Sequence, residues 1–84
     1  GGVPLAAHCP ITHEVFKDPV ITRYGHSYER SALEEALRTD AEVTKSGDWK
    51  QGARDPTTRR PLRWPGDIVT NRALRDVCVA MGWE

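Results

Sequence analysis

Four short stretches of this chain, met one after another, decide how it folds. They are Cys-Pro-Ile-Thr at 9–12, Asp-Pro-Val at 18–20, Tyr-Gly-His-Ser-Tyr-Glu-Arg at 24–30 and Asp-Pro-Thr-Thr-Arg-Arg-Pro-Leu at 55–62. The first and the last contain proline and few helix or strand signals, which is typical of ordered loops. Between them, the β-branched run at 20–22, a turn at Gly25 and a return at 26–28 predict a β-hairpin, since glycine accepts the positive φ of a tight turn.

A helix is predicted directly after this hairpin. Ser31 and Glu34 have the spacing of a capping box, and Leu33 and Leu37, four residues apart, share one face. The apolar pattern fades near residue 39. Residues 40–54 are polar and contain two glycines, so they are expected to form an inserted, mobile loop whose only large apolar residue is a tryptophan.

A short strand and a last helix are predicted after residue 62. The strand is expected at 68–69, and either Thr70 or Asn71 is suited to cap the helix that follows. Gly82 suits the C′ position at the end of that helix. Its apolar residues recur at i, i+3, i+4 and i+7, and they are Leu74, Val77, Cys78 and Met81. The order of elements predicts a small α+β domain.

Length and charge limit what the chain can be. Its 84 residues suffice for one domain, which we expect to span 8–84 after a flexible arm at 1–7. Twelve basic and twelve acidic residues give a formal net charge of zero, which argues against a general nucleic-acid binder, because such proteins gain affinity by neutralising phosphates. The arginines between 54 and 63 are therefore interpreted as a solvated loop.

No segment predicts a membrane span or secretion. No apolar run approaches the roughly 20 residues that a membrane helix needs, and no basic leader precedes an apolar run. Reduced thiols in a cytoplasmic or nuclear protein are therefore expected, although the two cysteines, Cys9 and Cys78, leave a single disulfide open by count.

The candidate metal ligands are too few for the two structural zinc ions of a zinc RING domain and too scattered to favour even one. Zinc sites of this kind take four closely spaced Cys or His ligands, and the chain offers five in all, which are His8, Cys9, His13, His26 and Cys78. No metal and no cofactor are expected. A nucleophilic Cys9 next to two histidines is an alternative, but a small buried cysteine is the preferred interpretation.

Taken together, the four stretches resemble the U-box family over roughly residues 8 to 83. This family has the RING-like outline of zinc RING domains but holds its loops without metal, through hydrogen bonds, ion pairs and packing. The resemblance implies a small RING-like U-box fold with two ordered loops, a β-hairpin, a central helix and a C-terminal helix. The side chains expected to replace the metal ligands are Asp18, Ser27, Glu29, Arg30, Thr57 and Thr58.

The resemblance also implies a surface that binds a ubiquitin-conjugating enzyme. Ile11 takes the place of the family's central hydrophobic anchor, with His13 beside it, although an isoleucine in that loop also fits the core. Pro56 matches the anchor of the second loop, and Ala36 matches the contributing helix position, where many members carry a larger residue. Arg59 matches the arginine that holds ubiquitin on the conjugating enzyme in a reactive arrangement, a role suited to the five donors of a guanidinium.

By resemblance, the chain is expected to be the U-box module of a ubiquitin ligase. Such a module binds a ubiquitin-conjugating enzyme, alone or loaded with ubiquitin, and promotes transfer of ubiquitin to substrate lysines without a covalent intermediate of its own. Regions outside the chain would bind the protein substrate, and a homodimer is left open. The alternative is a non-catalytic interaction or scaffold module. The small Ala36 and the extra length at 39–54 favour it slightly, whereas Ile11, Pro56 and Arg59 oppose it. Asp55 stands where the family commonly has cysteine, although some members carry aspartate there.

Overall fold

A computed structural model describes residues 2–83. A three-stranded antiparallel sheet forms its centre, with the order β2-β1-β3. Strand β1 (Pro19–Thr22) pairs with β2 (Ser27–Glu29) on one side and with β3 (Ile68–Thr70) on the other. The hairpin prediction is confirmed, since Gly25 has a φ of 85° in the turn between β1 and β2.

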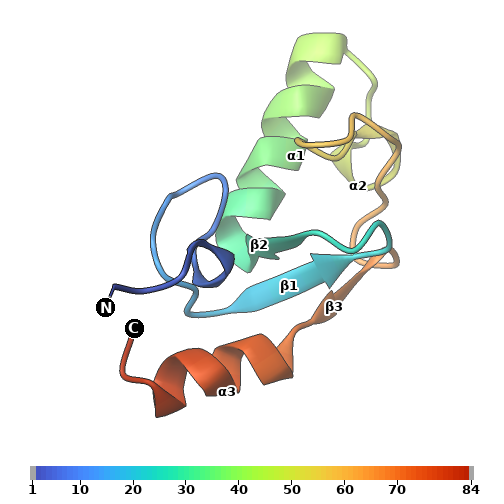
Figure 1. The fold of residues 1–84 in the computed structure, drawn as a ribbon. Coiled ribbons are helices and arrows are strands. Elements are labelled where there is room, and N and C mark those ends of the chain that lie inside the picture. Colours follow the sequence, from blue (N-terminus) through green and yellow to red (C-terminus); the bar gives the residue numbers. More distant parts are fainter. Residues whose placement is uncertain (1, 84) are drawn as a thin grey trace.

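The two main helices continue from the two edge strands (Figure 1). Helix α1 (Arg30–Thr44) follows β2 without a break, and α3 (Arg72–Ala80) follows β3 after a single residue. That residue, Asn71, caps α3 by accepting a hydrogen bond from the Leu74 N–H at 3.1 Å. Gly82 has a φ of 67° just beyond the helix, as its predicted C′ position requires. The α+β prediction is confirmed.

The predicted capping box is wrong. Helix α1 begins at Arg30, so that Ser31 lies inside its first turn, and no side chain caps the helix. Glu29 occupies the N-cap position, but its carboxylate accepts the backbone N–H groups of Lys17 and Asp18 at 3.0 and 2.8 Å. The continuous passage from strand to helix leaves no room for the cap predicted at Ser31.

Helix α1 also extends five residues into the segment predicted as a loop at 40–54. Leu33, Leu37 and Ala41 form one buried stripe, and the small Ala41 makes this stripe hard to recognise in the sequence. Residues 49–52 then form the short helix α2 (Trp49–Gly52), whose first residue packs half-buried against Trp64, with ring centroids 5.6 Å apart. The loop is therefore confined to a few residues on either side of α2.

The core fills the space between the sheet, α1 and the loops on either side. Its largest fully buried side chains include Phe16, Tyr28, Leu33, Leu37 and Leu62. Of the apolar stripe predicted for α3, however, Cys78 is buried, while Val77 and Met81 are 48% and 60% exposed. A single helical face of α3 contacts the sheet, so the stripe is wider than the contact.

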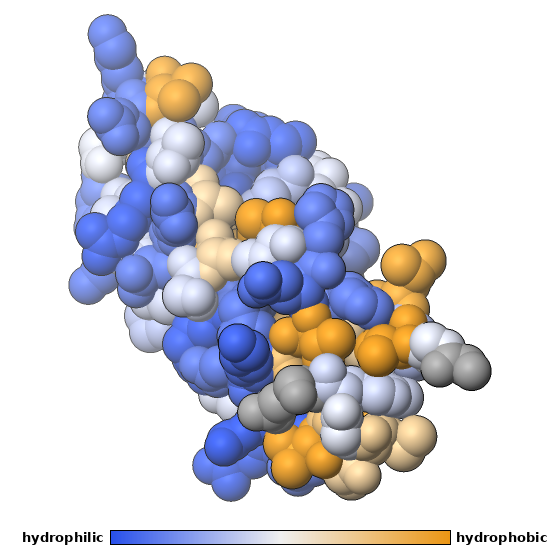
Figure 2. Space-filling model, turned by 90° about the vertical axis from the view of Figure 1, so that its left-hand side faces the viewer, coloured by the Kyte–Doolittle hydropathy of each residue, from blue (hydrophilic) through white to orange (hydrophobic). Residues whose placement is uncertain are grey.

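The end of the expected N-terminal arm belongs to the packed domain. Residues Leu5–Ala7 form the short 3-10 helix η1, and the buried Ala7 accepts a hydrogen bond from the Phe16 N–H at 3.0 Å. On the face that carries η1 and the end of α3, hydrophobic side chains gather around these two segments (Figure 2). Within residues 2–83, no helix combines the length and apolarity needed to cross a bilayer.

Candidate functional site

Two loops of this domain share one backbone design. The first loop (residues 8–15) is closed by a bridge between His8 and Val15, and the second loop (residues 54–61) by one between Arg54 and Pro61. We call them the twin loops. In each loop the second residue is followed by proline, as Cys9-Pro10 in the first loop and Asp55-Pro56 in the second. A threonine lies two positions after each of these prolines.

Their internal hydrogen bonds match position by position. In the first loop the Cys9 N–H donates to the Glu14 carbonyl and the His13 N–H to the Cys9 carbonyl, both at 2.8 Å. In the second, the Asp55 N–H donates to the Arg60 carbonyl at 2.8 Å and the Arg59 N–H to the Asp55 carbonyl at 2.9 Å. His13 and Arg59, with φ of 62° and 61°, therefore occupy equivalent left-handed positions.

The side chain of Cys9 supports the first loop from inside. The residue is 1% exposed, and its sulfur accepts the N–H groups of Ile11 at 3.4 Å and Glu29 at 3.3 Å. This burial leaves a nucleophilic Cys9 without access to a substrate. The sulfur instead orients the backbone that presents Ile11, so the structural interpretation of Cys9 holds and its thiol is free.

Asp55 supports the second loop in the same way. This fully buried carboxylate accepts, through Oδ1, the N–H groups of Thr57 at 2.7 Å and Thr58 at 3.0 Å, and the Tyr28 hydroxyl at 2.9 Å. The Tyr28 hydroxyl also contacts the Thr57 hydroxyl. Burial, with a smaller contribution from Asp55, raises the pKa of Tyr28 to about 12. A tyrosine of β2 thus anchors the second loop.

Ion pairs and hydrogen bonds tie the remaining segments together. Arg30 Nε lies 2.8 Å from an Asp18 carboxylate oxygen, and the same guanidinium contacts the Thr70 hydroxyl. Asn71 donates to the Ser27 hydroxyl at 3.3 Å. Five of the six polar residues expected to replace metal ligands link separate segments, whereas the Thr58 hydroxyl accepts the Arg60 N–H at 3.2 Å within the second loop. Within residues 2–83, no three His, Cys, Asp or Glu side chains are grouped so that they could hold a metal ion.

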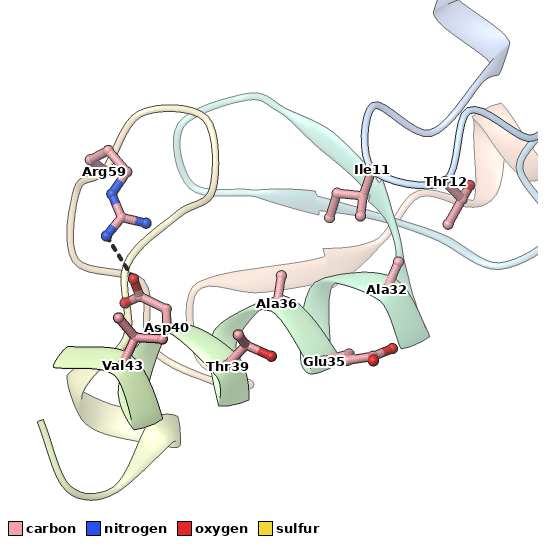
Figure 3. A pocket seen from close by; sticks show the side chains of 9 residues that line it. All are labelled: Ile11, Thr12, Ala32, Glu35, Ala36, Thr39, Asp40, Val43 and Arg59. Atoms are coloured by element: carbon pink, nitrogen blue, oxygen red, sulfur yellow. Dashed lines mark hydrogen bonds and ion pairs between the residues drawn. The ribbon is translucent and has the colours of Figure 1, made fainter. Parts of the chain in front are cut away.

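An apolar groove lies between the twin loops and α1 (Figure 3). Its cavity volume is about 540 Å³. The first loop contributes Ile11, which hangs over α1, and the second loop contributes Arg59 at the opposite end. The small side chains of Ala32 and Ala36 form the floor beneath Ile11. Its complete lining is Ile11, Thr12, Ala32, Glu35, Ala36, Thr39, Asp40, Val43 and Arg59.

Arg59 and its neighbour Arg60 point to different places. Arg59 Nη2 lies 2.6 Å from Asp40 Oδ1 at the rim of the groove, whereas the Arg60 guanidinium lies over the ring of Tyr24, 5.5 Å from its centroid. The backbone conformation of the second loop separates two arginines that are adjacent in sequence. Arg59, and not Arg60, therefore borders the groove.

Two of the predicted binding residues do not line this groove. His13 is exposed and borders other depressions of the surface, together with His8. Pro56 is half-buried within the second loop. The predicted groove residues that the fold does bring together are Ile11, Ala36 and Arg59.

Six of the nine groove residues were not foreseen, and two of them lie where no helix was expected. Asp40 and Val43 lie on the last turns of α1, in the segment that sequence reasoning assigned to a loop. Asp40 lies four residues after Ala36 and Val43 seven after it, and a helix extended beyond residue 39 would have placed all three on neighbouring positions of one face.

Comparison with known proteins agrees with this geometry. The model of the U-box domain family matches residues 3–80. The E3 ubiquitin-protein ligase CHIP of Arabidopsis thaliana is 37% identical over 78 residues, which cover 93% of this chain and 24% of that protein. The WD repeat, SAM and U-box domain-containing protein 1 of Gallus gallus is 56% identical over 74 residues, covering 87% of this chain and 13% of that protein.

The chain spans a quarter or less of the length of these relatives. The family match covers nearly all of it, and the match includes both twin loops, the sheet and the two main helices. The chain belongs to the U-box family, a family of ubiquitin ligases in which relatives of this chain are named E3 ubiquitin-protein ligases.

Proposed function

We propose that this U-box binds a ubiquitin-conjugating enzyme in the apolar groove and promotes transfer of its ubiquitin to lysine. One observation carries the proposal: Ile11, Ala36 and Arg59 come from three separate segments and meet around a single groove. An isoleucine on a rigid loop beside an apolar floor suits the anchor of a binding hot spot. The arginine at the rim supplies donors where a second protein would meet the first.

Transfer occurs directly from the conjugating enzyme to the acceptor lysine. The buried Cys9 offers no exposed thiol to carry ubiquitin. The domain instead acts by proximity and orientation, because holding the reacting ester in one arrangement raises the effective concentration of the attacking amine. Segments of a longer protein would deliver the substrate.

The test is single-turnover discharge of ubiquitin from a panel of loaded conjugating enzymes to free lysine. We expect at least one enzyme of the panel to discharge faster in the presence of the domain, and the Ile11→Ala variant to remove this acceleration. Leu5→Ala is the matched control, because Leu5 is 88% exposed on η1 and lies outside the groove. Discharge that stays at the uncatalysed rate with every enzyme of the panel would refute ligase activity.

The scaffold alternative rests on the small side chain of Ala36 in the groove floor, which offers little contact area. A binding titration alongside the discharge assay separates the two alternatives. A scaffold would bind a conjugating enzyme in titration without accelerating discharge, whereas a ligase module does both.

A further inference from the structure

Asp40 is fixed in place at both of its carboxylate oxygens. Its side chain is only 10% exposed near the end of α1. Oδ1 lies 2.6 Å from Arg59 Nη2, and Oδ2 accepts the backbone N–H of Arg54 at 3.0 Å. Burial opposes its ionisation, but the hydrogen bonds from Arg59 and Arg54 outweigh burial, and the pKa of Asp40 lies below its ordinary value. A charged acceptor with a partner at each carboxylate oxygen therefore stands at the rim of the groove.

The other partner of this ion pair stays open to solvent. Arg59 is 54% exposed, and within residues 2–83 its side chain donates to Asp40 through a single nitrogen, Nη2. A guanidinium has five N–H donors in a rigid fork, so most of them remain available. Its backbone is held as well, since the Arg59 carbonyl accepts from Arg54 Nη1 at 3.3 Å. Figure 3 shows the side chain reaching from the second loop toward Asp40.

We propose that Asp40 is a positioning residue for Arg59, which it holds at the rim of the groove with its remaining donors directed outward for the ubiquitin-loaded conjugating enzyme. This inference rests on the proposed function of the groove. A long arginine side chain loses rotational freedom when it is fixed in a complex. Because Asp40 fixes it beforehand, less freedom is lost when the loaded enzyme binds. Fixing Arg59 in advance is therefore expected to raise the rate of ubiquitin discharge.

Asp40→Asn tests this idea with little change in shape. The variant keeps an oxygen that can accept the Arg54 N–H, but it removes the charge that attracts Arg59. Asp67→Asn is a matched control. Asp67 also accepts a backbone N–H, from Arg63 at 2.8 Å, and lies 3.8 Å from an arginine, Arg23, yet it is outside the groove. Asp40→Glu, which keeps the charge, serves as the conservative replacement.

Two measurements separate positioning from a general structural role. The first is the ¹⁵N relaxation of the Arg59 Nε–H group in the free domain, which reports whether the side chain is ordered. The second is single-turnover discharge to free lysine, compared with the affinity for the conjugating enzyme on the same preparation. Each variant is also unfolded in urea, so that a loss of fold is recognised.

We expect Arg59 Nε–H to be ordered in the wild type and mobile in Asp40→Asn. Discharge should fall about 3- to 10-fold in Asp40→Asn while affinity for the conjugating enzyme changes little, and Asp40→Glu should recover most of the rate. Asp67→Asn should discharge at the wild-type rate. In an Arg59→Ala background, Asp40→Asn should cause no further loss, because the two residues act as a pair.

Several results would overturn the inference. If the Arg59 Nε–H group is mobile in the wild-type domain, that measurement alone would overturn the inference. Unchanged discharge in Asp40→Asn would contradict positioning, and faster discharge would show that Asp40 restrains Arg59 instead. An equal loss in the wild-type and Arg59→Ala backgrounds would assign Asp40 a role in the loop alone. A wild-type domain that fails to accelerate discharge would refute the proposed function itself.

Discussion

The Tyr28 hydroxyl donates a hydrogen bond to Asp55 Oδ1 at 2.9 Å, and this contact joins β2 to the second loop across 27 residues of sequence. Both residues are fully buried. Because the same carboxylate oxygen also accepts two N–H groups of the loop, it links the central sheet to the backbone that presents Arg59.

Removing the Tyr28 hydroxyl should therefore destabilise the domain. We expect Tyr28→Phe to lower the free energy of unfolding by about 1–3 kcal/mol, because a buried carboxylate oxygen loses a donor. Urea unfolding measures the change. Tyr24→Phe is the control, since the Tyr24 hydroxyl donates to the exposed Pro61 carbonyl, where water can replace it. An equal loss of unfolding free energy in Tyr28→Phe and Tyr24→Phe would show that the buried Tyr28–Asp55 hydrogen bond stabilises the domain no more than an exposed one.

The raised pKa of Tyr28 predicts a loss of stability at high pH. The group has a pKa of about 12 in the folded protein against 10.0 as its reference. Its contribution is therefore complete below about pH 10 and is lost as the pH rises toward 12. The difference in unfolding free energy between wild type and Tyr28→Phe should shrink between about pH 10 and about pH 12. A constant difference over that interval would contradict the shift.

Truncation of Ile11 should affect binding more than folding. Ile11 is half-buried and packs against the edge of the core, so Ile11→Ala should reduce stability by less than about 2 kcal/mol. Affinity for the conjugating enzyme should fall by about 2 kcal/mol or more, as expected for a hot-spot anchor. Titration and urea unfolding of one preparation compare the two. A variant that unfolds would identify Ile11 as a core residue.

Arg59→Ala should slow ubiquitin discharge more than it weakens binding. The arginine is expected to act mainly on the ubiquitin-loaded enzyme, so its loss appears in rate, on the order of 10- to 100-fold. Arg60→Ala is the matched control, because Arg60 stacks over Tyr24 away from the groove. Slower discharge in Arg60→Ala but not in Arg59→Ala would assign the ubiquitin-positioning role to Arg60 instead. If Arg59→Ala lowers affinity and discharge rate to the same extent, Arg59 is an ordinary interface residue.

Local signals in the sequence were sufficient for much of the fold. The turn at Gly25, the strand at 68–69, a helix cap at Thr70 or Asn71 and the helix end at Gly82 depend on residues a few positions apart. All four are present in the structure, with Asn71 as the cap. Ile11, Ala36 and Arg59, which line the groove, were singled out because they match positions of the U-box family that the motifs resemble.

The repetition of the twin loops was also visible in principle. Residue-Pro-x-Thr occurs at 9–12 and again at 55–58. Its meaning depends on the fold, however, because only the closed loops show that the Cys9 sulfur and the Asp55 carboxylate perform the same task from inside. A thiol and a carboxylate have no common signal in a sequence pattern.

The sequence by itself determined the turn at Gly25, a cap for the last helix at Thr70 or Asn71, and the α+β order, because these follow from the preferences of neighbouring residues. The three groove residues came from the resemblance of the motifs to the U-box family. Only the tertiary structure decided the far end of α1, the different partners of Arg59 and Arg60, and the pairing of Asp40 with Arg59. That pair joins residues 19 apart, and its carboxylate lies on the helical turn that carries the buried Ala41. Contacts of this kind depend on how the second loop packs against the helix, and packing between distant segments has no local signal.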